Sequence, residues 1–436
     1  MADRWSRSKR WLERHGGWAL VVTACATLLV TLIVITFMPP ERQIDFAPRH
    51  LYAVDDPQFK RTIGTLLGPP ILGGNRVDTL KNGDEIFPAM LDAIRSAKHN
   101  IDFETYVYWS GKIGRDFADA IAERARAGVK AHVLLDWVGS QKMEKVALQT
   151  MRDAGARVEF YHPLRWYTFA RMNNRTHRKL LVVDGRVGFT GGVGIAEEWT
   201  GDAGDPEHWR DTHFRVEGPA VAQMQGVFLD NWMKVTGEVS HGVEFFPALA
   251  GAGDSDAQMF ESSPTGGSAS MELMYLLAIV AAKRQILLEA AYFIPDDLAS
   301  EALIDARKRG VDVRVIVPGK YNDAKVTRYA SRSTWGPLLD AGVRIYEYQP
   351  TMFHCKVMVV DGLFTSVGST NFDDRSFRLN DEASLNVFDA GVAAEQAKVF
   401  EADVAQSKEY TLADWAARPW WQRLSEWASS TVEAQL

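Results

Sequence analysis

Cysteine is nearly absent from this sequence, whose 436 residues contain only Cys25 and Cys355. Cys25 falls within an apolar run and Cys355 lies between a histidine and a lysine, so their positions define no disulfide framework. An excess of positive charge is missing too, since 49 Lys and Arg residues stand against 56 Asp and Glu residues, a formal net charge of −7. This balance argues against a protein that coats nucleic acid through bulk positive charge, although a local basic groove stays possible.

Long apolar runs are also scarce, and the exception lies near the N-terminus. Residues 18–38, WALVVTACATLLVTLIVITFM, carry no charge over a length close to the roughly 20 residues that a helix needs to cross a bilayer. Basic residues precede this run and mixed charge follows it, so the positive-inside rule predicts a single-pass anchor with a cytoplasmic N-terminus and an extracytoplasmic body. A cleaved signal peptide is the competing interpretation, but the run is long for one and lacks an obvious small-x-small cleavage site.

The remainder of the chain repeats itself. AIRSAKHNIDFETYVYW around Lys98 matches AIVAAKRQILLEAAYFI around Lys283, and each passes from a helix-like stretch into an apolar strand. The helix and strand patterns that follow also correspond, with Gly128 and Gly310 ending matched helices. The alternation predicts an α/β fold, in which a mixed or parallel sheet is flanked by helices in each half. The chain is therefore a duplication, with its seam between about residues 238 and 268.

Seven segments follow from these patterns. They are a basic N-terminus (1–17), a transmembrane helix (18–38), a linker and the start of the body (39–80), a first half (81–240), an inter-half linker (241–268), a second half (269–410) and a Trp-rich C-terminal amphipathic segment (411–436). As a helix after Pro419, the last segment would place Trp420, Leu424 and Trp427 on one face. That pattern suits a membrane interface, and packing of the tryptophans into the core is the alternative.

One eight-residue motif occurs at the matching place in both halves, as HRKLLVVD from His177 and as HCKVMVVD from His354. In a strand, His177 and Lys179 share a face, as do His354 and Lys356. A single H-x-K-x-x-x-x-D motif is weak evidence, but two copies in a duplicated fold predict a functional site. Zinc would need more His or Cys ligands nearby, and a lysine beside each histidine favours an anion. We therefore predict neither a metal nor another cofactor.

Each motif ends on an aspartate that precedes a glycine. Asp184-Gly and Asp361-Gly are turn signals that should join each motif strand to the next strand, so a mainly structural role stands beside a catalytic one for these two residues. Small residues follow seven positions later, and in the second half they include Ser369 and lead to Asn371. Small residues let a ligand approach the backbone, and Asn371 can donate a hydrogen bond to an oxyanion.

These residue types suit phosphodiester chemistry. One histidine can attack phosphorus to form a covalent phosphohistidine, while the other protonates the leaving alkoxide and then activates the incoming hydroxyl. The two lysines and Asn371 would neutralise the non-bridging oxygens. Asp211 and Glu382, which each open a strand downstream of a motif, are candidates to orient the second ring nitrogen of each histidine. Glu104 and Glu289 occupy equivalent repeat positions and are predicted to line the same cleft, with a capping or hinge role as the alternative.

The paired motifs, with GSTN after the second, resemble the phospholipase D superfamily over nearly all of the chain beyond the apolar run. Within it, THRKLLVVDGRVGFTGG, WRDTHFRVEGPAV and STNFDDRSF resemble the bacterial cardiolipin synthase branch. The resemblance implies two duplicated phospholipase D-like halves with the active site at their interface, at the bacterial inner membrane. It also implies His177 as nucleophile, His354 as general acid, and the joining of two phosphatidylglycerols with release of glycerol. Gly194 stands where the pattern has Asn, which predicts an asymmetric site.

The acceptor remains open at this stage. Membrane phospholipids, phosphatidylglycerol among them, are the predicted partners, but a phospholipase D-type hydrolase or a single-strand nuclease would use the same chemistry, because acceptor choice depends on how dry the cleft is. A scaffold with vestigial motifs is disfavoured because both motifs are complete. The stretch YHPLRWYTFARMNNR, which includes Trp166, Tyr167 and Phe169, suits lipid headgroups and also stacking on single-stranded bases.

Overall fold

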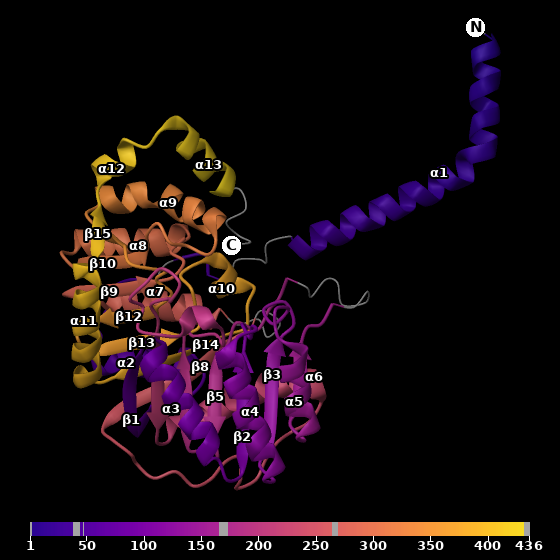
Figure 1. Ribbon diagram of the computed structural model, residues 1–436. Coiled ribbons are helices and arrows are strands. Elements are labelled where there is room, and N and C mark those ends of the chain that lie inside the picture. The colour runs from indigo at the N-terminus through magenta and orange to yellow at the C-terminus, as the bar shows by residue number, and fades with distance from the viewer. Residues whose placement is uncertain (1, 38–43, 47, 165–172, 264–268, 431–436) are drawn as a thin grey trace.

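The computed structural model describes residues 2–37, 44–46, 48–164, 173–263 and 269–430. One long helix, α1 (Ala2–Phe37), extends away from a body in which the two halves of the chain lie next to each other (Figure 1). Within α1, Gly17–Val34 is long and apolar enough to cross a membrane, and none of this stretch is buried against the body. An N-terminal apolar helix is therefore confirmed where the sequence predicts a span.

The first half is built from alternating helices and strands. In chain order these are α2 (Pro57–Leu66), β1 (Leu72–Lys81), α3 (Asn82–Ser96), β2 (Asn100–Thr105), α4 (Lys112–Arg126), β3 (Lys130–Asp136), α5 (Lys145–Asp153), β4 (Arg157–Tyr161), β5 (Leu180–Val183), β6 (Val187–Gly191), a 3-10 helix (Glu197–Trp199), β7 (Thr212–Glu217) and α6 (Ala220–Thr236).

The second half repeats this series and adds a C-terminal extension. Its elements are β8 (Ser255–Ser262), α7 (Ser270–Ala281), β9 (Gln285–Ala290), α8 (Asp297–Lys308), β10 (Asp312–Pro318), α9 (Lys325–Asp340), β11 (Arg344–Tyr348), β12 (Lys356–Val360), β13 (Phe364–Gly368), α10 (Asp374–Arg378), β14 (Glu382–Phe388), α11 (Ala390–Ala405), β15 (Ser407–Tyr410), α12 (Leu412–Ala416) and α13 (Trp420–Ser430).

Among the described residues, fifteen strands form one continuous sheet that mirrors itself about its centre. The order is β15-β11-β10-β9-β12-β13-β14-β8-β1-β7-β6-β5-β2-β3-β4, so that β1 and β8 join the two halves. In each half three strands run parallel, β2-β3-β4 and β9-β10-β11, while the others pair antiparallel. The predicted α/β duplication with a mixed sheet is thus confirmed, and the motif strands β5 and β12 occupy equivalent places.

The predicted inter-half linker, 241–268, is in part folded. Ser255–Ser262 form β8, which pairs antiparallel with β14 along its length, from Asp256 opposite Phe388 to Ser262 opposite Glu382. The strand SDAQMFES carries polar side chains at buried positions, so the sequence lacks the alternation of apolar and polar residues that would indicate a strand. Likewise β1, except for its last residue Lys81, falls within the segment 39–80. The first strand of each half, β1 or β8, therefore lies mainly in a segment that the sequence analysis treats as a linker.

Buried side chains fuse the halves into one body. One apolar cluster joins α6 of the first half to α11 of the second, including Phe228, Trp232 and Phe400, and it includes residues of both motif strands. Two further clusters fill the opposite face, one under α3 to α5 and one under α2 and α7 to α9. The four residues of β5, LLVV, are all buried, as strands covered on both faces require. The site between the halves is therefore held by packed elements on both sides.

Candidate active site

The two motifs meet at one cavity of about 290 Å³ between the halves. Side chains from both halves line it: Tyr106, Val107, Trp109, Arg175, His177, Lys179, Trp199, Trp209, Tyr292, Asp323, His354, Asn371, Asp373, Arg375 and Asn380. Of the residues predicted from sequence, His177, Lys179, His354 and Asn371 are therefore brought together. Lys356 adjoins them, since its Nζ lies 3.3 Å from His354 Nε2.

Short backbone pairings place each motif against the other half. Thr176 forms a parallel bridge with Asp381, and the His177 amide donates to the Asp381 carbonyl over 2.9 Å. In the same way Phe353 bridges Arg210, and the His354 amide donates to the Arg210 carbonyl over 2.8 Å. The residues that follow Asp381 and Arg210 are the two carboxylates predicted to orient the histidines.

Each histidine consequently contacts the carboxylate of the opposite half. His177 Nδ1 lies 2.9 Å from Glu382 Oε1, and His354 Nδ1 lies 2.8 Å from Asp211 Oδ2. A histidine that donates from Nδ1 to a carboxylate keeps Nε2 as its unprotonated nitrogen, ready to attack or to take a proton. The halves thus exchange their orienting groups, which the sequence order alone does not indicate.

The cavity disfavours further positive charge. Burial first, and then the charges of Lys179 and Lys356, hold the pKa of His177 well below its ordinary value. Burial and Lys356 lower the pKa of His354, while burial and Lys356 lower the pKa of Lys179 to about 7. Four basic groups crowded in a buried space repel one another's charged forms, so an anion that enters restores their protonation. The arrangement is that of an anion-binding site.

The two orienting carboxylates differ in charge state. Burial raises the pKa of Glu382 to about 7, although Lys179 and a hydrogen bond from Ser369 oppose the shift. Burial acts on Asp211 too, but the hydrogen bond and charge of His354, together with Lys356, outweigh it and hold the pKa below its ordinary value. At neutral pH Asp211 is therefore ionised, whereas Glu382 is close to half protonated. Ser369 acts on Glu382 and does not line the cavity.

The two flanks of the cavity also differ. Beside His354 lie the rings of Trp199 and Trp209, with ring centroids 5.1 and 5.6 Å from the imidazole. Beside His177 lies the ring of Tyr106, with its centroid 5.3 Å away, and Arg175 also lines the cavity. The side of His354, with its two tryptophans, is the aromatic flank of the cavity, whereas the side of His177 has one tyrosine.

Gly194, which stands where the resemblance predicts Asn, adjoins the aromatic flank. A Cβ on Gly194 would come within 2.7 Å of Val107 Cβ and 3.2 Å of the Trp199 ring. Trp199 in turn donates from Nε1 to Asp211 Oδ2 over 2.9 Å. A tryptophan that holds Asp211 thus occupies the space beside Gly194, which accounts for the asymmetry.

Most of the flank residues were not predicted from the sequence. They are Tyr106, Val107, Trp109, Trp199, Trp209, Tyr292, Asp323, Asp373, Arg375 and Asn380. A signal for two of them exists, because Trp209 and Asn380 stand two residues before Asp211 and Glu382. Arg175, which also lines the cavity, likewise stands two residues before His177. In extended backbone, residues two apart point to the same side. The neighbours two positions before the predicted site residues could therefore have been predicted to face the same cavity.

The motif aspartates lie elsewhere. Asp184 accepts hydrogen bonds from the backbone amides of residues 98, 99 and 100, and Asp361 from those of residues 283, 284 and 285. Both have a left-handed backbone, with φ of 53° and 54°, as does the glycine after each, so the predicted Asp-Gly hairpin turns are present. We correct the catalytic interpretation of these two residues: their carboxylates bind the start of β2 and β9, at the far end of the motif strands.

The paired glutamates, Glu104 and Glu289, do not line the cavity either. Glu104 Oε1 accepts from Thr176 Oγ1 over 2.6 Å and from Asn231 Nδ2 over 2.8 Å, and burial raises its pKa to about 7. Glu289 is equally buried, behind Cys355 and near the Arg210–Asp403 ion pair. The prediction that both line the cleft is therefore corrected: they support the motif segments from behind, because β2 and β9 turn these side chains into the protein.

Glu289 yields a prediction for stability. Burial, and then the charge of Asp403, raise the pKa of Glu289 from 4.5 to about 8, so the folded state binds a proton that the unfolded state releases. Its contribution to stability is therefore complete below about pH 4.5 and is lost as the pH rises through about 8. Glutamine does not ionise, so Glu289→Gln does not lose this stability as the pH rises. We expect the melting temperature of the variant, relative to that of the wild type, to increase by several degrees between pH 5 and pH 8.5.

Thermal melts across this pH range, with the exposed Glu301→Gln as control, test the assignment. A difference between Glu289→Gln and the wild type that stays constant from pH 5 to pH 8.5 would show that Glu289 is ionised throughout in the folded protein.

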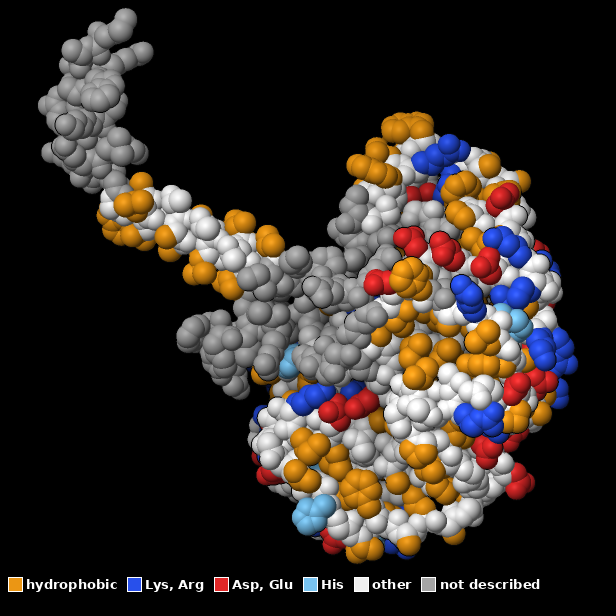
Figure 2. All heavy atoms as spheres, turned by 180° about the vertical axis from the view of Figure 1, so that it is seen from behind, with side chains coloured by type: hydrophobic (Ala, Val, Ile, Leu, Met, Phe, Trp, Pro, Cys, Tyr) orange, Lys and Arg blue, Asp and Glu red, His pale blue; other side chains and the backbone are white. Residues whose placement is uncertain are grey.

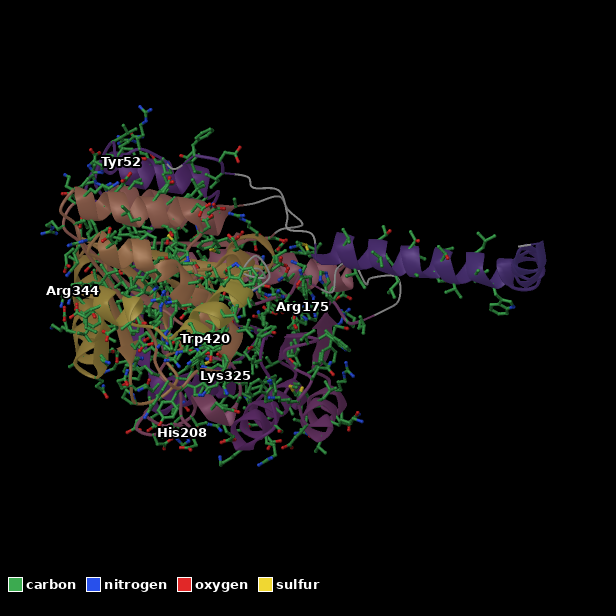
Figure 3. The ribbon with its side chains drawn as sticks, turned by 90° about the horizontal axis from the view of Figure 1, so that it is seen from above. Tyr52, Arg175, His208, Lys325, Arg344 and Trp420 are labelled. Carbon is green, nitrogen blue, oxygen red and sulfur yellow. The ribbon has the colours of Figure 1, made fainter. Side chains whose placement is uncertain are left out.

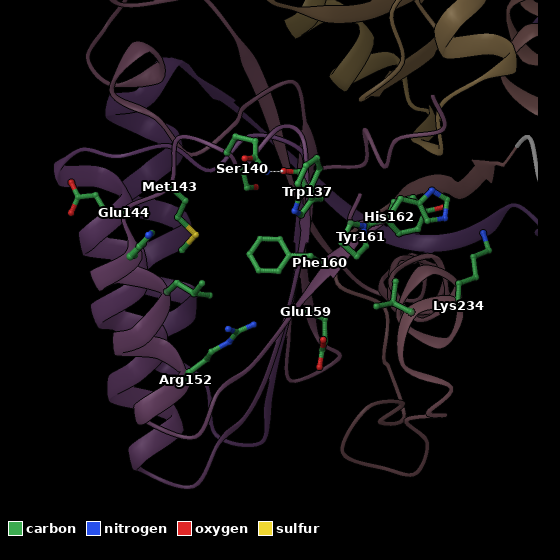
Figure 4. A pocket seen from close by; sticks show the side chains of 15 residues that line it. Trp137, Ser140, Met143, Glu144, Arg152, Glu159, Phe160, Tyr161, His162 and Lys234 are labelled. Atoms are coloured by element: carbon green, nitrogen blue, oxygen red, sulfur yellow. Dashed lines mark hydrogen bonds between the residues drawn. The ribbon is translucent and has the colours of Figure 1, made fainter. Parts of the chain in front are cut away.

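A larger hollow of about 790 Å³ lies at the edge of the first half, between β4 and α5 (Figure 4). Met143, Phe160, Trp137 and Lys234 are among the side chains that line it. None of the motif residues lines this hollow, so the larger of the two cavities is not the candidate active site. The predicted aromatic group Trp166, Tyr167 and Phe169 falls outside the described residues.

Comparison with known proteins gives consistent results. The family described as "Cardiolipin synthase, PLD-like domain" matches residues 90–225 and 275–404. Cardiolipin synthase 2 of Bacillus anthracis is 37% identical over 334 residues, which are 76% of this chain and 65% of that protein. The major cardiolipin synthase of Bacillus subtilis is 34% identical over 355 residues, 81% of this chain and 73% of that one. The chain thus spans about two thirds of the first relative's length.

Solved structures share the fold. The phosphatidylserine synthase of Haemophilus influenzae superposes with a TM-score of 0.63, at 15% identity, over 87% of this chain and all of that one.

Proposed function

The chain belongs to the family of cardiolipin synthases with phospholipase D-like domains, and on that premise we propose that it is a membrane-anchored phosphatidyltransferase that joins two phosphatidylglycerols and releases glycerol. The observation that carries the proposal is the pair of histidines in one buried cavity, each held by a carboxylate of the opposite half. Two lysines beside them supply positive charge for a phosphodiester.

In the first step His177 Nε2 attacks phosphorus, and the bond from phosphorus to the glycerol oxygen breaks. Protonated His354 gives its Nε2 proton to the leaving oxygen, while ionised Asp211 stabilises the imidazolium. The lipid phosphate supplies the negative charge that the crowded basic groups lack, so its binding favours protonation of His354. The products of this step are free glycerol and a phosphatidyl group on His177.

In the second step the glycerol hydroxyl of another phosphatidylglycerol attacks the same phosphorus. Neutral His354 takes the proton of this hydroxyl, the bond from phosphorus to His177 Nε2 breaks, and cardiolipin leaves. Lys179, Lys356 and Asn371 neutralise the non-bridging oxygens in both steps. Both histidines return to their starting protonation states, so the cycle needs no other reactant.

The aromatic flank favours an alcohol over water. Trp199 and Trp209 lie beside the His354 imidazole and line the cavity, and their apolar rings lower its water content. The second half has Asn380 at the position equivalent to Trp209. We therefore expect Trp209→Asn to raise the proportion of phosphatidic acid among the products by about tenfold.

Quantification of cardiolipin and phosphatidic acid by mass spectrometry checks this ratio, with Trp137→Asn on the larger hollow as the matched control. An unchanged ratio in Trp209→Asn, at reduced or normal total turnover, would show that this flank does not select the acceptor.

The proposed function itself is tested by product analysis of the full chain in detergent micelles of phosphatidylglycerol. Cardiolipin and glycerol in equal amounts support the transferase. Phosphatidic acid alone would show that water is the acceptor and that the enzyme is a phospholipase, and unchanged lipid would overturn the proposal. Parallel incubation with single-stranded DNA tests the nuclease alternative.

Anchoring by α1 is part of the same proposal. The stretch Gly17–Val34 follows basic residues, which supports a cytoplasmic N-terminus and an extracytoplasmic catalytic body. A reporter enzyme fused after Leu436 that is active only outside the cytoplasm tests this orientation.

A further inference from the structure

The C-terminal helix α13 turns its apolar side chains away from the protein. Trp420, Trp421, Leu424 and Trp427 are 75%, 53%, 54% and 65% exposed. At 100° per residue these four form one stripe, while the side packed on α9 carries the buried Glu426 and Ser429. A helix that packs on a soluble protein ordinarily has the opposite arrangement, so the exposed stripe is not explained by folding of the body.

Polar contacts hold α13 in this orientation. The Arg418 guanidinium lies 3.8 Å from the Trp415 ring centroid and forms an ion pair with Glu426. Trp415 Nε1 donates to the Arg332 carbonyl of α9 over 3.0 Å. A capping box of Thr411 and Asp414 begins α12, the helix before it. The outward stripe is therefore a fixed surface and not the face of a loose tail.

The chemistry of the stripe fits a lipid headgroup region. Tryptophan concentrates at membrane interfaces, where its ring is apolar and its N–H finds polar partners. Exposed Arg423 lies at the margin of the stripe, and its guanidinium donates to backbone carbonyls while forming no ion pair with a carboxylate among the described residues. Apolar rings beside a cation complement a bilayer that contains anionic phospholipid.

A bilayer is also within reach of this surface. The apolar stretch of α1 ends at Val34, and Ile44 already packs against the core of the second half. About ten residues join these points, which span at most about 35 Å. The second half, which carries α13, is thus tethered beside any membrane that α1 crosses. In Figure 2 apolar side chains gather at the top of the body, where Figure 1 places α13.

Helix α9 connects this surface to the catalytic cavity. Helix α9, on which α13 packs, begins at Lys325, two residues after the cavity residue Asp323. Figure 3 labels Trp420 and Lys325, the first residues of α13 and α9, in a view from above. A membrane that covers the stripe would lie one helix away from the cavity.

We propose that Trp420, Trp421, Leu424 and Trp427 insert into the headgroup region of a bilayer that contains anionic phospholipid, and so hold the second half against the lipid surface. This docking surface does not depend on the reaction, and it would act on a protein that hydrolyses lipid or transfers it.

The test uses the full chain in nanodiscs of phosphatidylglycerol and phosphatidylcholine. A nitrobenzoxadiazole fluorophore is attached at Ala428→Cys, within the stripe, in a Cys25→Ser background in which the remaining Cys355 is buried. We expect blue-shifted emission and strong quenching by lipids that carry a nitroxide near the headgroup. The control label at Gln149→Cys, exposed on α5, should show neither effect. Trp420→Ala/Trp427→Ala, introduced into the Ala428→Cys protein, should reduce quenching at least about fivefold.

Other outcomes overturn the proposal. Absence of quenching at position 428, or equal quenching at position 149, would show that α13 does not enter the lipid. Disulfide cross-linking between two copies of the unlabelled Ala428→Cys protein, without lipid quenching of the labelled one, would assign the stripe to an interface between copies of the chain.

An activity measurement adds a second readout. Trp420→Ala/Trp427→Ala should lower turnover of phosphatidylglycerol in vesicles by about tenfold and leave turnover of dispersed short-chain phosphatidylglycerol unchanged, because the stripe acts on the surface and not on the chemistry. The exposed pair Val239→Ala/Val243→Ala is the control. An equal loss on both substrates would contradict surface docking. If the protein turns over neither substrate, the fluorescence result still decides the proposal, since it requires no catalysis.

Discussion

Replacement of His177 or His354 by alanine should lower cardiolipin formation by about 10⁴-fold, because each variant removes either the attacking nitrogen or the proton donor. The double variant should be little worse than either single variant, since the two groups act as one unit. Cardiolipin released from phosphatidylglycerol micelles, measured by mass spectrometry, gives the rates. Thermal melts of each variant separate loss of chemistry from loss of folding.

A substrate with a good leaving group separates the two roles. The phosphatidyl ester of p-nitrophenol needs no proton on its departing oxygen, so His354→Ala should recover most of a burst of p-nitrophenol, whereas His177→Ala should recover none. The covalent phosphatidyl group should then be found on His177 by peptide mass spectrometry. Recovery in His177→Ala alone would reverse the assignment of nucleophile and acid.

Exchange of the carboxylates for amides should have very unequal effects. At Asp211, Oδ2 accepts from both His354 Nδ1 and Trp199 Nε1, while Oδ1 accepts from the Thr212 amide. Each of these neighbours is a hydrogen-bond donor. In Asp211→Asn the NH2 group of the amide, which is also a donor, must therefore face one of them whichever way the side chain turns. We expect a loss of about 10³-fold or more, as for other histidines left in the wrong tautomer.

Glu382→Gln should be far milder, with a loss of about tenfold at pH 8. The amide oxygen can still accept from His177 Nδ1, and the amide nitrogen can donate to the hydroxyl of Ser369, which accepts as readily as it donates. Steady-state rates of both variants on phosphatidylglycerol micelles test the comparison. Losses of equal size would show that the two halves use their carboxylates in the same way. That result would contradict the inferred difference in charge state between Asp211 and Glu382.

The same pair predicts a dependence on pH. The pKa of Glu382 is raised to about 7, chiefly by burial, so its ionised form, which strengthens His177 as a nucleophile, grows as the pH rises through 7. Wild-type activity should therefore rise between pH 6 and pH 8, and Glu382→Gln should lack that rise. A rise that persists in the variant would assign it to another group.

Much of this architecture could be predicted from the sequence because it depends on short-range patterns. The alternation of helix and strand follows from the spacing of apolar residues over a few turns. The hairpins after the two motifs follow from Asp-Gly, since both residues adopt positive φ in the turn. The histidine and lysine of each motif share a side because extended backbone repeats every two residues. The single apolar run near the N-terminus likewise indicated a helix able to cross a membrane.

The arrangement of the candidate active site could not be predicted in the same way. His177 and Glu382 are 205 positions apart, and their contact depends on the bridge between Thr176 and Asp381, which no local period indicates. The roles of Asp184 and Glu289 likewise depend on where their strands end in the sheet and on which face is buried. The sequence pattern groups them with the candidate site residues, whereas the structure places Asp184 at the far end of its motif strand and Glu289 in the core.

Local patterns along the chain predict the α/β duplication, the paired histidines and lysines, the two turns and the apolar N-terminal helix, because each depends on residues that are near neighbours. Only the folded chain shows which carboxylate contacts which histidine, that two tryptophans lie beside His354, and that the stripe of α13 faces outward. These features depend on packing between segments that are 83 to 205 positions apart, where burial and hydrogen-bond partners are set by the fold as a whole.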